Sequence, residues 1–421
     1  MTQHPLARQY KRIPELLAPA GDFAKLRTAI HYGADAVYLA GKQFGLRAGA
    51  GNFAEDELRR AVAYAHARGV RVYVTVNIYA RNSDLQGLAA YLQQVRAAEA
   101  DALIIADPGV LNVARETLPE MPLHLSTQAN VTNTASARFW AAQGVSRLNL
   151  ARELGLAEIG QIRAATDCAL EVFVHGALCI SYSGRCLLST YFTGRDANRG
   201  DCAQPCRYAY RLVEEKRPGQ YFPVEEDERG TYIFNSRDLC LLNRLPELVA
   251  AGVDSLKIEG RMKSVGYVGG VVRVYRAALD WIGERLGTGA SVAGLTLPEY
   301  YADEILKFGT RGQTENFFAG PPAGVGMLFD RTRLEQEWAP VGIVSQADPL
   351  VIETRNVLEI GDLIEYMGCG FVTVGCTVTG MAMADGAPIY RANPGQTVRL
   401  TTDPPVPEPE QLCLIRKRIR R

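Results

Sequence analysis

Four cysteines in one short polar stretch are the residues best suited to chemistry in this chain. Cys179 and Cys186 lie seven positions apart, and Cys202 and Cys206 lie four positions apart. Thiolates that converge from one loop can hold a metal ion or an iron–sulfur cluster, although these spacings differ from the Cys-x₂-Cys pairs of zinc ribbons. Ordinary buried cysteines, packed as small hydrophobic groups, are the alternative. Glycines and charged residues nearby make the stretch polar, which favours the ligand interpretation.

His175 is a candidate for nucleophilic or acid–base chemistry, because it stands at the end of an expected strand just before Cys179. A Cys179–His175 pair would suit a cysteine peptidase. The alternatives are a hydrogen-bonded structural histidine or a group that supports a nearby cluster. The sequence contains neither the His-Glu-x-x-His motif of zinc peptidases nor the Gly-x-Ser-x-Gly motif of serine hydrolases.

Polar side chains at other expected strand ends would meet at one face of the fold. Lys257 and Arg261 could hold an anionic substrate through charge-assisted hydrogen bonds. A Lys–Glu–Arg ion-pair network that only closes the fold is an equally good interpretation of Lys257. The predicted catalytic residues are Asn77, Gln128, His175, Lys257, Glu259 and Arg261.

Arginines and aromatic residues alternate around the last two cysteines of the stretch. We predict that Arg195, Arg199, Arg207 and Tyr208 bind RNA, since arginine contacts phosphates and an aromatic ring stacks on an unpaired base. The alternative is that the arginines are solvated and the rings pack the loop against the fold. The 46 basic residues balance 46 acidic ones, which argues against a DNA-coating protein but is compatible with a local basic groove.

The elements that position these residues alternate between short apolar runs and amphipathic helical stretches. Eight such units in residues 1–286 predict an α/β fold, a (β/α)₈ TIM-like barrel, with a cysteine-containing insertion at 187–230. An open doubly wound sheet is the rival, but no Gly-x-Gly-x-x-Gly follows any expected strand. The expected strands are 15–18, 36–40, 70–76, 102–106, 122–126, 147–150, 170–174 and 255–258, and the helices that precede the fourth and the eighth of them are expected over 83–98 and 239–251.

The remainder of the chain has a different pattern. Residues 287–340 lack clear periodicity and are predicted to form a linker that packs on the barrel. From 341 to 421, short strands separated by Gly, Asp and Pro predict a small β-barrel. Residues 416–421 hold five basic groups, and they are interpreted as a solvated tail or, alternatively, as a phosphate contact.

Composition limits the class of protein. The chain is 47% hydrophobic and 22% charged, as in ordinary globular proteins. No run approaches the roughly 20 apolar residues of a membrane span, and the first 14 residues lack the apolar core of a secretory signal. We therefore expect a cytoplasmic protein that is not embedded in a membrane. In the cytoplasm its thiols would remain reduced.

The run from Glu171 to Ser189, which contains Glu171-Val-Phe-Val-His175-Gly-Ala-Leu-Cys179 and Gly184-Arg-Cys186, resembles the signature of the collagenase-like peptidase family U32. Other segments, among them Ser126-Thr-Gln-Ala-Asn130 and Ser255-Leu-Lys-Ile-Glu-Gly-Arg261, look like the branch of that family formed by tRNA hydroxylation proteins. The resemblance covers residues 13–285 closely and the C-terminal part loosely.

This resemblance implies a tRNA-modifying enzyme that hydroxylates the wobble uridine to 5-hydroxyuridine without oxygen, in a prephenate-dependent reaction. It further implies a 4Fe–4S cluster on Cys179, Cys186, Cys202 and Cys206, with Cys240 as an alternative ligand in place of one of the last two. The expected partners are tRNA and prephenate or a similar small anion. A collagenase-like peptidase is the alternative function, and a non-catalytic RNA-binding protein is a third.

Overall fold

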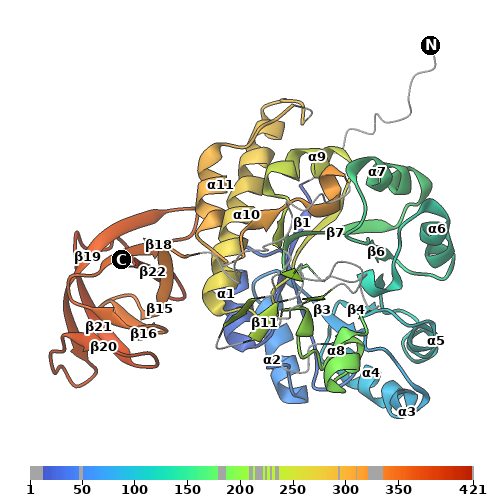
Figure 1. Cartoon of the computed structure of the whole chain (residues 1–421), viewed down its shortest axis with the longest axis horizontal. Coiled ribbons are helices and arrows are strands. Elements are labelled where there is room, and N and C mark those ends of the chain that lie inside the picture. The colour runs from blue at the N-terminus through green and yellow to red at the C-terminus, as the bar shows by residue number, and fades with distance from the viewer. Residues whose placement is uncertain are drawn as a thin grey trace.

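The computed structural model describes residues 13–46, 51–178, 186–207, 212–213, 221–222, 225–227, 230–232, 237–292, 294–309, 311–320 and 335–419. Cys179 and Tyr208 lie outside the described residues. The described chain forms a larger α/β barrel and a smaller β-barrel beside it (Figure 1).

Eight parallel strands form the larger part, which confirms the predicted (β/α)₈ fold. The first seven pair in chain order, and the eighth, β13, closes the ring by pairing with both β1 and β7. Because helices cover the outside (Figure 1), the strands are apolar along most of their length. The strands are β1 (Glu15–Pro19), β2 (Ala36–Leu39), β3 (Arg71–Val76), β4 (Ala102–Ile105), β5 (Leu123–Leu125), β6 (Arg147–Asn149), β7 (Ala169–Gly176) and β13 (Ser255–Ile258).

Polar caps begin several of the surrounding helices. Asp22 accepts a hydrogen bond from the backbone N–H of Lys25 at the start of α1, and Asp107 does the same for Val110 at the start of α5. Such caps satisfy backbone donors that have no partner within the helix. The helices are α1 (Phe23–His31), α2 (Glu55–His66), α3 (Asn82–Leu85), α4 (Leu88–Ala97), α5 (Pro108–Thr117), α6 (Thr134–Ala142), α7 (Leu156–Ala165), α9 (Leu245–Ala250) and α10 (Val265–Gly287).

Two helices differ from their expected bounds for local reasons. The helix expected over 83–98 is divided into α3 and α4 at Gly87, whose positive φ of 81° is incompatible with a continuing helix. The helix expected over 239–251 is shorter. Its first residues form β12 (Asp238–Cys240), antiparallel to the end of β7, and α9 begins next to Pro246, which favours a helix start.

The predicted small β-barrel is confirmed as a closed barrel of six antiparallel strands. Along β21 (Thr397–Asp403), exposed and buried residues alternate, as expected for a strand with one face toward a core. Within the region expected as a linker, α11 (Glu299–Leu306) packs beside α10 (Figure 1). The other barrel strands are β15 (Trp338–Gln346), β16 (Val351–Thr354), β18 (Leu363–Met367), β19 (Thr373–Met383) and β22 (Leu414–Arg418).

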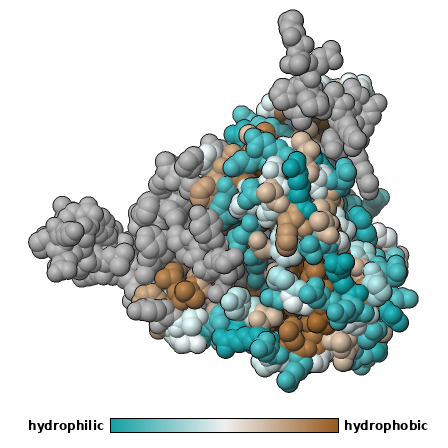
Figure 2. Space-filling model, turned by 90° about the vertical axis from the view of Figure 1, so that its right-hand side faces the viewer, coloured by the Kyte–Doolittle hydropathy of each residue, from teal (hydrophilic) through white to brown (hydrophobic). Residues whose placement is uncertain are grey.

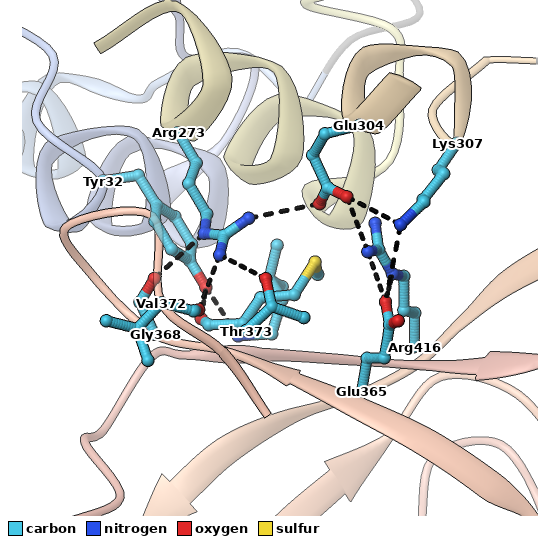
Figure 3. A network of polar contacts seen from close by, with 11 residues as sticks. Tyr32, Arg273, Glu304, Lys307, Glu365, Gly368, Val372, Thr373 and Arg416 are labelled. Carbon is cyan, nitrogen blue, oxygen red and sulfur yellow. Dashed lines mark hydrogen bonds and ion pairs between the residues drawn. The ribbon is translucent and has the colours of Figure 1, made fainter. Parts of the chain in front are cut away.

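A buried polar network joins the two barrels (Figure 3). Arg273 of α10 donates to the Gly368 carbonyl oxygen at 2.9 Å and to the Thr373 hydroxyl at 2.7 Å. Glu304 of α11 lies 3.2 Å from Arg273 and 2.9 Å from Arg416 of β22. Arg416 is only 2% exposed, so for this residue the expectation of a solvated tail was wrong. Arg416 instead pairs with Glu304 and so holds α11 against the small barrel.

The outer face of the α/β barrel around α5 and α6 is a mixture of teal and brown atoms (Figure 2). Single exposed apolar side chains such as Phe139 contribute to it, which is normal for a helix that faces water. Among the residues that the structure describes, no helix combines the length and the apolar character needed to cross a bilayer.

Candidate active site at the mouth of the α/β barrel

A cavity of about 680 Å³ lies at the ends of the barrel strands. Strand-end residues form its floor, and the segment after β7 forms one wall, as in enzymes built on this fold. The cavity brings together five of the six predicted catalytic residues and three of the predicted cysteine ligands. These are Asn77, Gln128, Lys257, Glu259, Arg261, Cys186, Cys202 and Cys206.

The cysteine-bearing wall is held in shape by short-range hydrogen bonds. In α8 (Leu188–Thr193), the Ser189 hydroxyl accepts a hydrogen bond of 2.9 Å from the backbone N–H of Ala203. Gln204 adopts a left-handed φ of 58°, and its N–H points at the Cys202 sulfur at 3.3 Å. Cys186, Cys202 and Cys206 thereby line the same cavity.

The donor set at this wall fits an iron–sulfur cluster. Thiolates are the usual cluster ligands, and backbone N–H groups aimed at their sulfurs help to set the reduction potential. Cys186 is 8% exposed, and Cys202 and Cys206 are half-buried, so a group held between them would face the cavity and be largely shielded from water. Cys179, the fourth predicted ligand, lies outside the described residues.

Lys257 stands at the floor of the cavity and belongs to a buried ion-pair network. Its Nζ lies 2.6 Å from Glu171 Oε1 and 4.5 Å from the centre of the Tyr38 ring. Arg147 connects Glu171, at 3.3 Å, to Glu15, at 2.7 Å. The Lys–Glu–Arg ion-pair network considered for Lys257 is therefore present. The Lys257 ammonium group nevertheless lines the cavity, so it also contributes positive potential there.

Arg261 and Glu259 follow β13 and reach the cavity from the loop after it. Arg261 is 3% exposed, and it donates to the Leu46 carbonyl oxygen and, at 3.4 Å, to the Thr75 hydroxyl. The Tyr38 hydroxyl lies 3.2 Å from Glu259 Oε2. Both charged groups are thus held by neighbouring strands, which is the pre-organisation that a binding site needs.

Asn77 and Gln128 form an amide pair on the other side of the floor. Asn77 Nδ2 donates to Gln128 Oε1 at 2.7 Å, and the Ser126 hydroxyl donates to the same oxygen at 3.1 Å. The pair fixes the orientation of both amides and leaves them at the cavity surface.

Asn149, at the end of β6, is a site residue that the sequence did not reveal. It lines the cavity and is 2% exposed, and among the described residues its Oδ1 has no hydrogen-bond partner. A buried acceptor without a partner is costly unless a ligand or water supplies a donor. Its position at the end of a barrel strand was the only signal that could have indicated it.

His175 lies away from the cavity. Its Nδ1 is 3.4 Å from the Tyr275 hydroxyl, and its ring packs against Tyr267 and Tyr275 of α10. Burial lowers the pKa of His175 to about 4, so the ring is neutral near pH 7. This placement favours the structural alternative for His175.

Cys240, the alternative ligand, lies on the same side as His175. It pairs with His175 across β12 and β7, and its sulfur is 3.9 Å from the Tyr275 hydroxyl. Burial raises the pKa of its thiol. The structure thus separates Cys240 from the three cysteines that line the cavity.

The predicted RNA-binding arginines have different environments. Arg195 is half exposed and pairs with Asp201 at 2.6 Å. Arg199 reaches across to Asp84 of α3 with two hydrogen bonds, of 2.6 and 2.8 Å, and this contact lowers the pKa of Asp84 to about 2. Arg207 ends the 3₁₀ turn Pro205–Arg207, and Tyr208 lies outside the described residues. Arg199 therefore docks the wall onto the barrel, whereas Arg195 stays accessible.

Basic side chains outnumber acidic ones in the lining of the cavity, and three of them pair with carboxylates behind it, Lys257 with Glu171 and both Lys263 and Arg311 with Asp238. Six basic side chains and two acidic ones are among its described lining residues, and low-dielectric walls strengthen the resulting potential. The basic residues are Arg152, Arg195, Lys257, Arg261, Lys263 and Arg311, and the acidic ones are Asp201 and Glu259.

Comparison with family models assigns both barrels of this chain to one family. The family model "Peptidase family U32" matches residues 21–327, and the model of the U32 C-terminal domain matches residues 336–416. The chain therefore belongs to peptidase family U32.

Individual relatives carry names of different kinds. A tRNA hydroxylation protein of Bacillus subtilis is 36% identical over 395 residues, covering 93% of this chain and 92% of that protein. An uncharacterized protease of Methanocaldococcus jannaschii is 40% identical over 309 residues, which is 72% of each chain. A 23S rRNA 5-hydroxycytidine synthase of Escherichia coli is 37% identical over 350 residues, covering 83% of this chain and 52% of that enzyme.

Proposed function

We propose that this chain is an RNA-modifying enzyme that hydroxylates tRNA at the mouth of its α/β barrel. More specifically, the proposed reaction converts the wobble uridine to 5-hydroxyuridine without oxygen, depends on prephenate or a similar small anion, and uses a 4Fe–4S cluster. The observation that carries the proposal is the convergence of Cys186, Cys202 and Cys206 on the same basic cavity as Lys257 and Arg261. The near full-length similarity to a tRNA hydroxylation protein supports it.

Cys186, Cys202 and Cys206, together with Cys179, would hold the cluster. When bound, an iron–sulfur cluster would supply electron transfer at the cavity wall. Hydroxylation at C5 of uridine is a two-electron oxidation. In the proposed reaction the co-substrate gives up a hydroxyl group and takes up the C5 hydrogen, so that R–OH and C5–H become R–H and C5–OH and the co-substrate is reduced by two electrons.

The chain's own polar groups would position the two substrates. Arg261 and Lys257 suit the carboxylates of a small dianion, because charge-assisted hydrogen bonds are the strong ones. Asn149 Oδ1 and the Asn77–Gln128 pair suit the edge of a uracil base, whose N3–H can donate to an amide oxygen.

The accessible part of the cavity wall would contact the tRNA. Arg195 projects beside the cysteines, where it could meet a phosphate of the anticodon loop. A wobble base is already unpaired, so bringing it into the cavity costs little unstacking energy. The proposal places the protein in the cytoplasm, where it would meet its tRNA substrate.

The peptidase alternative lacks support in the described site. It depended on a Cys179–His175 pair, and His175 packs against Tyr275 behind β7. A neutral histidine held there is poorly placed to activate a nucleophile at the cavity.

The test is nucleoside mass analysis of tRNA from a deletion strain that carries the wild-type gene, Cys202→Ser or Cys168→Ser. Cys168 donates to the Val145 carbonyl oxygen at 3.0 Å and lies at the start of β7, far from the mouth. We expect 5-hydroxyuridine with the wild type and with Cys168→Ser, and none with Cys202→Ser. Wobble hydroxylation that persists in the deletion strain carrying an empty vector, with peptide cleavage by the purified protein, would favour the peptidase instead.

A further inference from the structure

A second group of metal-binding side chains lies at the seam between the two barrels, away from the mouth. His31 is the last residue of α1, Cys369 lies between β18 and β19, and Cys413 directly precedes β22. The seam is tightly fixed at this point, because the Tyr32 hydroxyl donates to the Met367 carbonyl oxygen and accepts from the Leu414 N–H, both at 2.7 Å.

The three potential ligand atoms already have the spacing of a single metal centre. His31 Nε2 lies 3.3 Å from Cys369 Sγ and 3.3 Å from Cys413 Sγ, and all three atoms lie within 4.8 Å of one another. In a tetrahedral site with Zn–S bonds of about 2.3 Å and Zn–N bonds of about 2.0 Å, neighbouring ligand atoms are separated by about 3.5–3.8 Å. Only small movements would be needed to admit the ion.

The surroundings can support such a centre. Cys413 is fully buried, and Cys369 and His31 are half-buried. The Tyr366 hydroxyl, which accepts from the Glu410 N–H at 2.8 Å, lies near Cys413, and groups around the ligands are what orients them in metal sites. A surface cavity of about 730 Å³, lined in part by His31 and Leu412, adjoins the cluster. It offers an entry path and room for a water molecule as the fourth ligand.

We propose that His31, Cys369 and Cys413 bind one Zn²⁺ ion that fastens the small β-barrel to the α/β barrel. Two thiolates and one imidazole are a zinc-type donor set. His31 comes from the α/β barrel and both cysteines come from the small barrel, so the ion stabilises the docked arrangement. This site is independent of the proposed tRNA chemistry and would exist in a protein with any activity at the mouth.

Zinc analysis of anaerobically purified protein tests the proposal. Because zinc can also enter the cysteines at the mouth, the comparison is made in a Cys202→Ser/Cys206→Ser background. We expect about one equivalent of zinc there, falling at least about tenfold when Cys369→Ser and Cys413→Ser are added. Cys376→Ser is the matched control, since Cys376 is buried within the small barrel but is not part of the cluster.

Cobalt titration gives a second readout, which does not depend on whether the double cysteine variant folds. Co²⁺ added to metal-free protein should give the absorption of a tetrahedral thiolate site, and His31→Ala should weaken its binding by about 10–100-fold. Zinc content that is unchanged by the substitutions would overturn the proposal. A Cys369–Cys413 disulfide in the freshly isolated protein, detected as two thiols that resist alkylation, would overturn it as well.

Discussion

The cysteines at the mouth and those at the seam differ in where they come from in the chain and in what they face. Cys186, Cys202 and Cys206 belong to one segment of the chain and face a cavity of about 680 Å³. Cys369 and Cys413 come from separate segments of the small barrel and meet His31 of the other barrel across a packed interface. The first arrangement gives reactants access to the thiols, and the second gives the thiols a fixed geometry.

This difference corresponds to the general division between catalytic and structural metal sites. Catalytic sites keep a position open to substrate, whereas structural sites contribute to folding, and the seam site would do so with three protein ligands and a water molecule. Changes at the mouth should therefore alter chemistry with little effect on stability. Changes at the seam should alter stability with little effect on chemistry.

The strongest expected effect is that of Cys202→Ser. Loss of a thiolate should abolish the visible absorbance and iron content of the protein and lower tRNA hydroxylation below detection, a loss of at least about 100-fold. The melting temperature of the small barrel should be unchanged. Iron analysis and absorbance spectra check this result, with Cys168→Ser as the matched control. Full iron content in Cys202→Ser would remove this cysteine from the ligand set.

At the seam, Glu304→Gln should destabilise the protein by about 3 kcal/mol, because it removes the carboxylate partner of the buried Arg273 and one of the two carboxylate partners of Arg416. Denaturant unfolding measures the change. The exposed Glu353, which pairs with Arg355 at 2.8 Å, provides the control, since Glu353→Gln should cost less than about 1 kcal/mol. Similar costs for the two variants would contradict a closed, energetically important seam.

The same glutamate predicts a pH dependence. Burial raises the pKa of Glu304, but Arg416 and Lys307 outweigh burial and hold the pKa below its usual value of 4.5. The stability from this group is therefore complete above pH 4.5 and is lost as the pH falls further through the lowered pKa. Unfolding measured between neutral pH and the acid range should show a smaller loss for Glu304→Gln than for the wild type. Parallel pH profiles would exclude this contribution.

A pair of asparagines sharpens the contrast between chemistry and stability. Asn149→Ala should reduce hydroxylation about three- to tenfold, the value of one hydrogen bond to a substrate, and should leave the melting temperature unchanged. Asn133 caps α6 by accepting from the Ser136 N–H at 2.9 Å. Asn133→Ala should lower stability by about 1 kcal/mol with full activity. Kinetic and thermal measurements on both variants check this pattern, and a stability loss in Asn149→Ala would assign it a structural role.

The smallest effects concern tRNA binding. Arg195→Ala should reduce the salt dependence of tRNA binding by about one unit, as expected for one lost phosphate contact. Arg199→Ala should change tRNA binding indirectly, by loosening the cysteine-bearing wall of the cavity. Asp84→Asn, which weakens the same contact, should therefore have the same effect as Arg199→Ala. Filter-binding titrations at several salt concentrations distinguish the two arginines. A salt slope unchanged in Arg195→Ala would remove that residue from the RNA interface.

The sequence predicted the barrel and much of its mouth because their signals are local. Each strand is a short apolar run, and strand ends of a closed barrel necessarily converge, so Lys257, Arg261 and Gln128 could be placed together. Simple alternation along β7 would put His175 on the same face as Phe173, which lines the cavity, but the structure places His175 against α10. A register shift between β7 and β13 interrupts that alternation, and a shift of one residue reverses the side to which a residue points.

Other features depend on contacts that no local pattern encodes. The partner of Arg199 is Asp84, 115 positions earlier, and His31 meets Cys369 across 338 positions. Asn149 carries no motif, and only its missing hydrogen-bond partner distinguishes it. Such sites appear only when the fold brings distant segments together.

The most direct test of the central claim is an anaerobic reaction of the purified, cluster-loaded protein with unmodified tRNA and prephenate, followed by nucleoside mass analysis. We predict 5-hydroxyuridine at the wobble position with the wild-type protein and with Cys168→Ser, and none with Cys202→Ser. Product that forms equally well with Cys202→Ser, or that forms only when oxygen is admitted, would contradict the account.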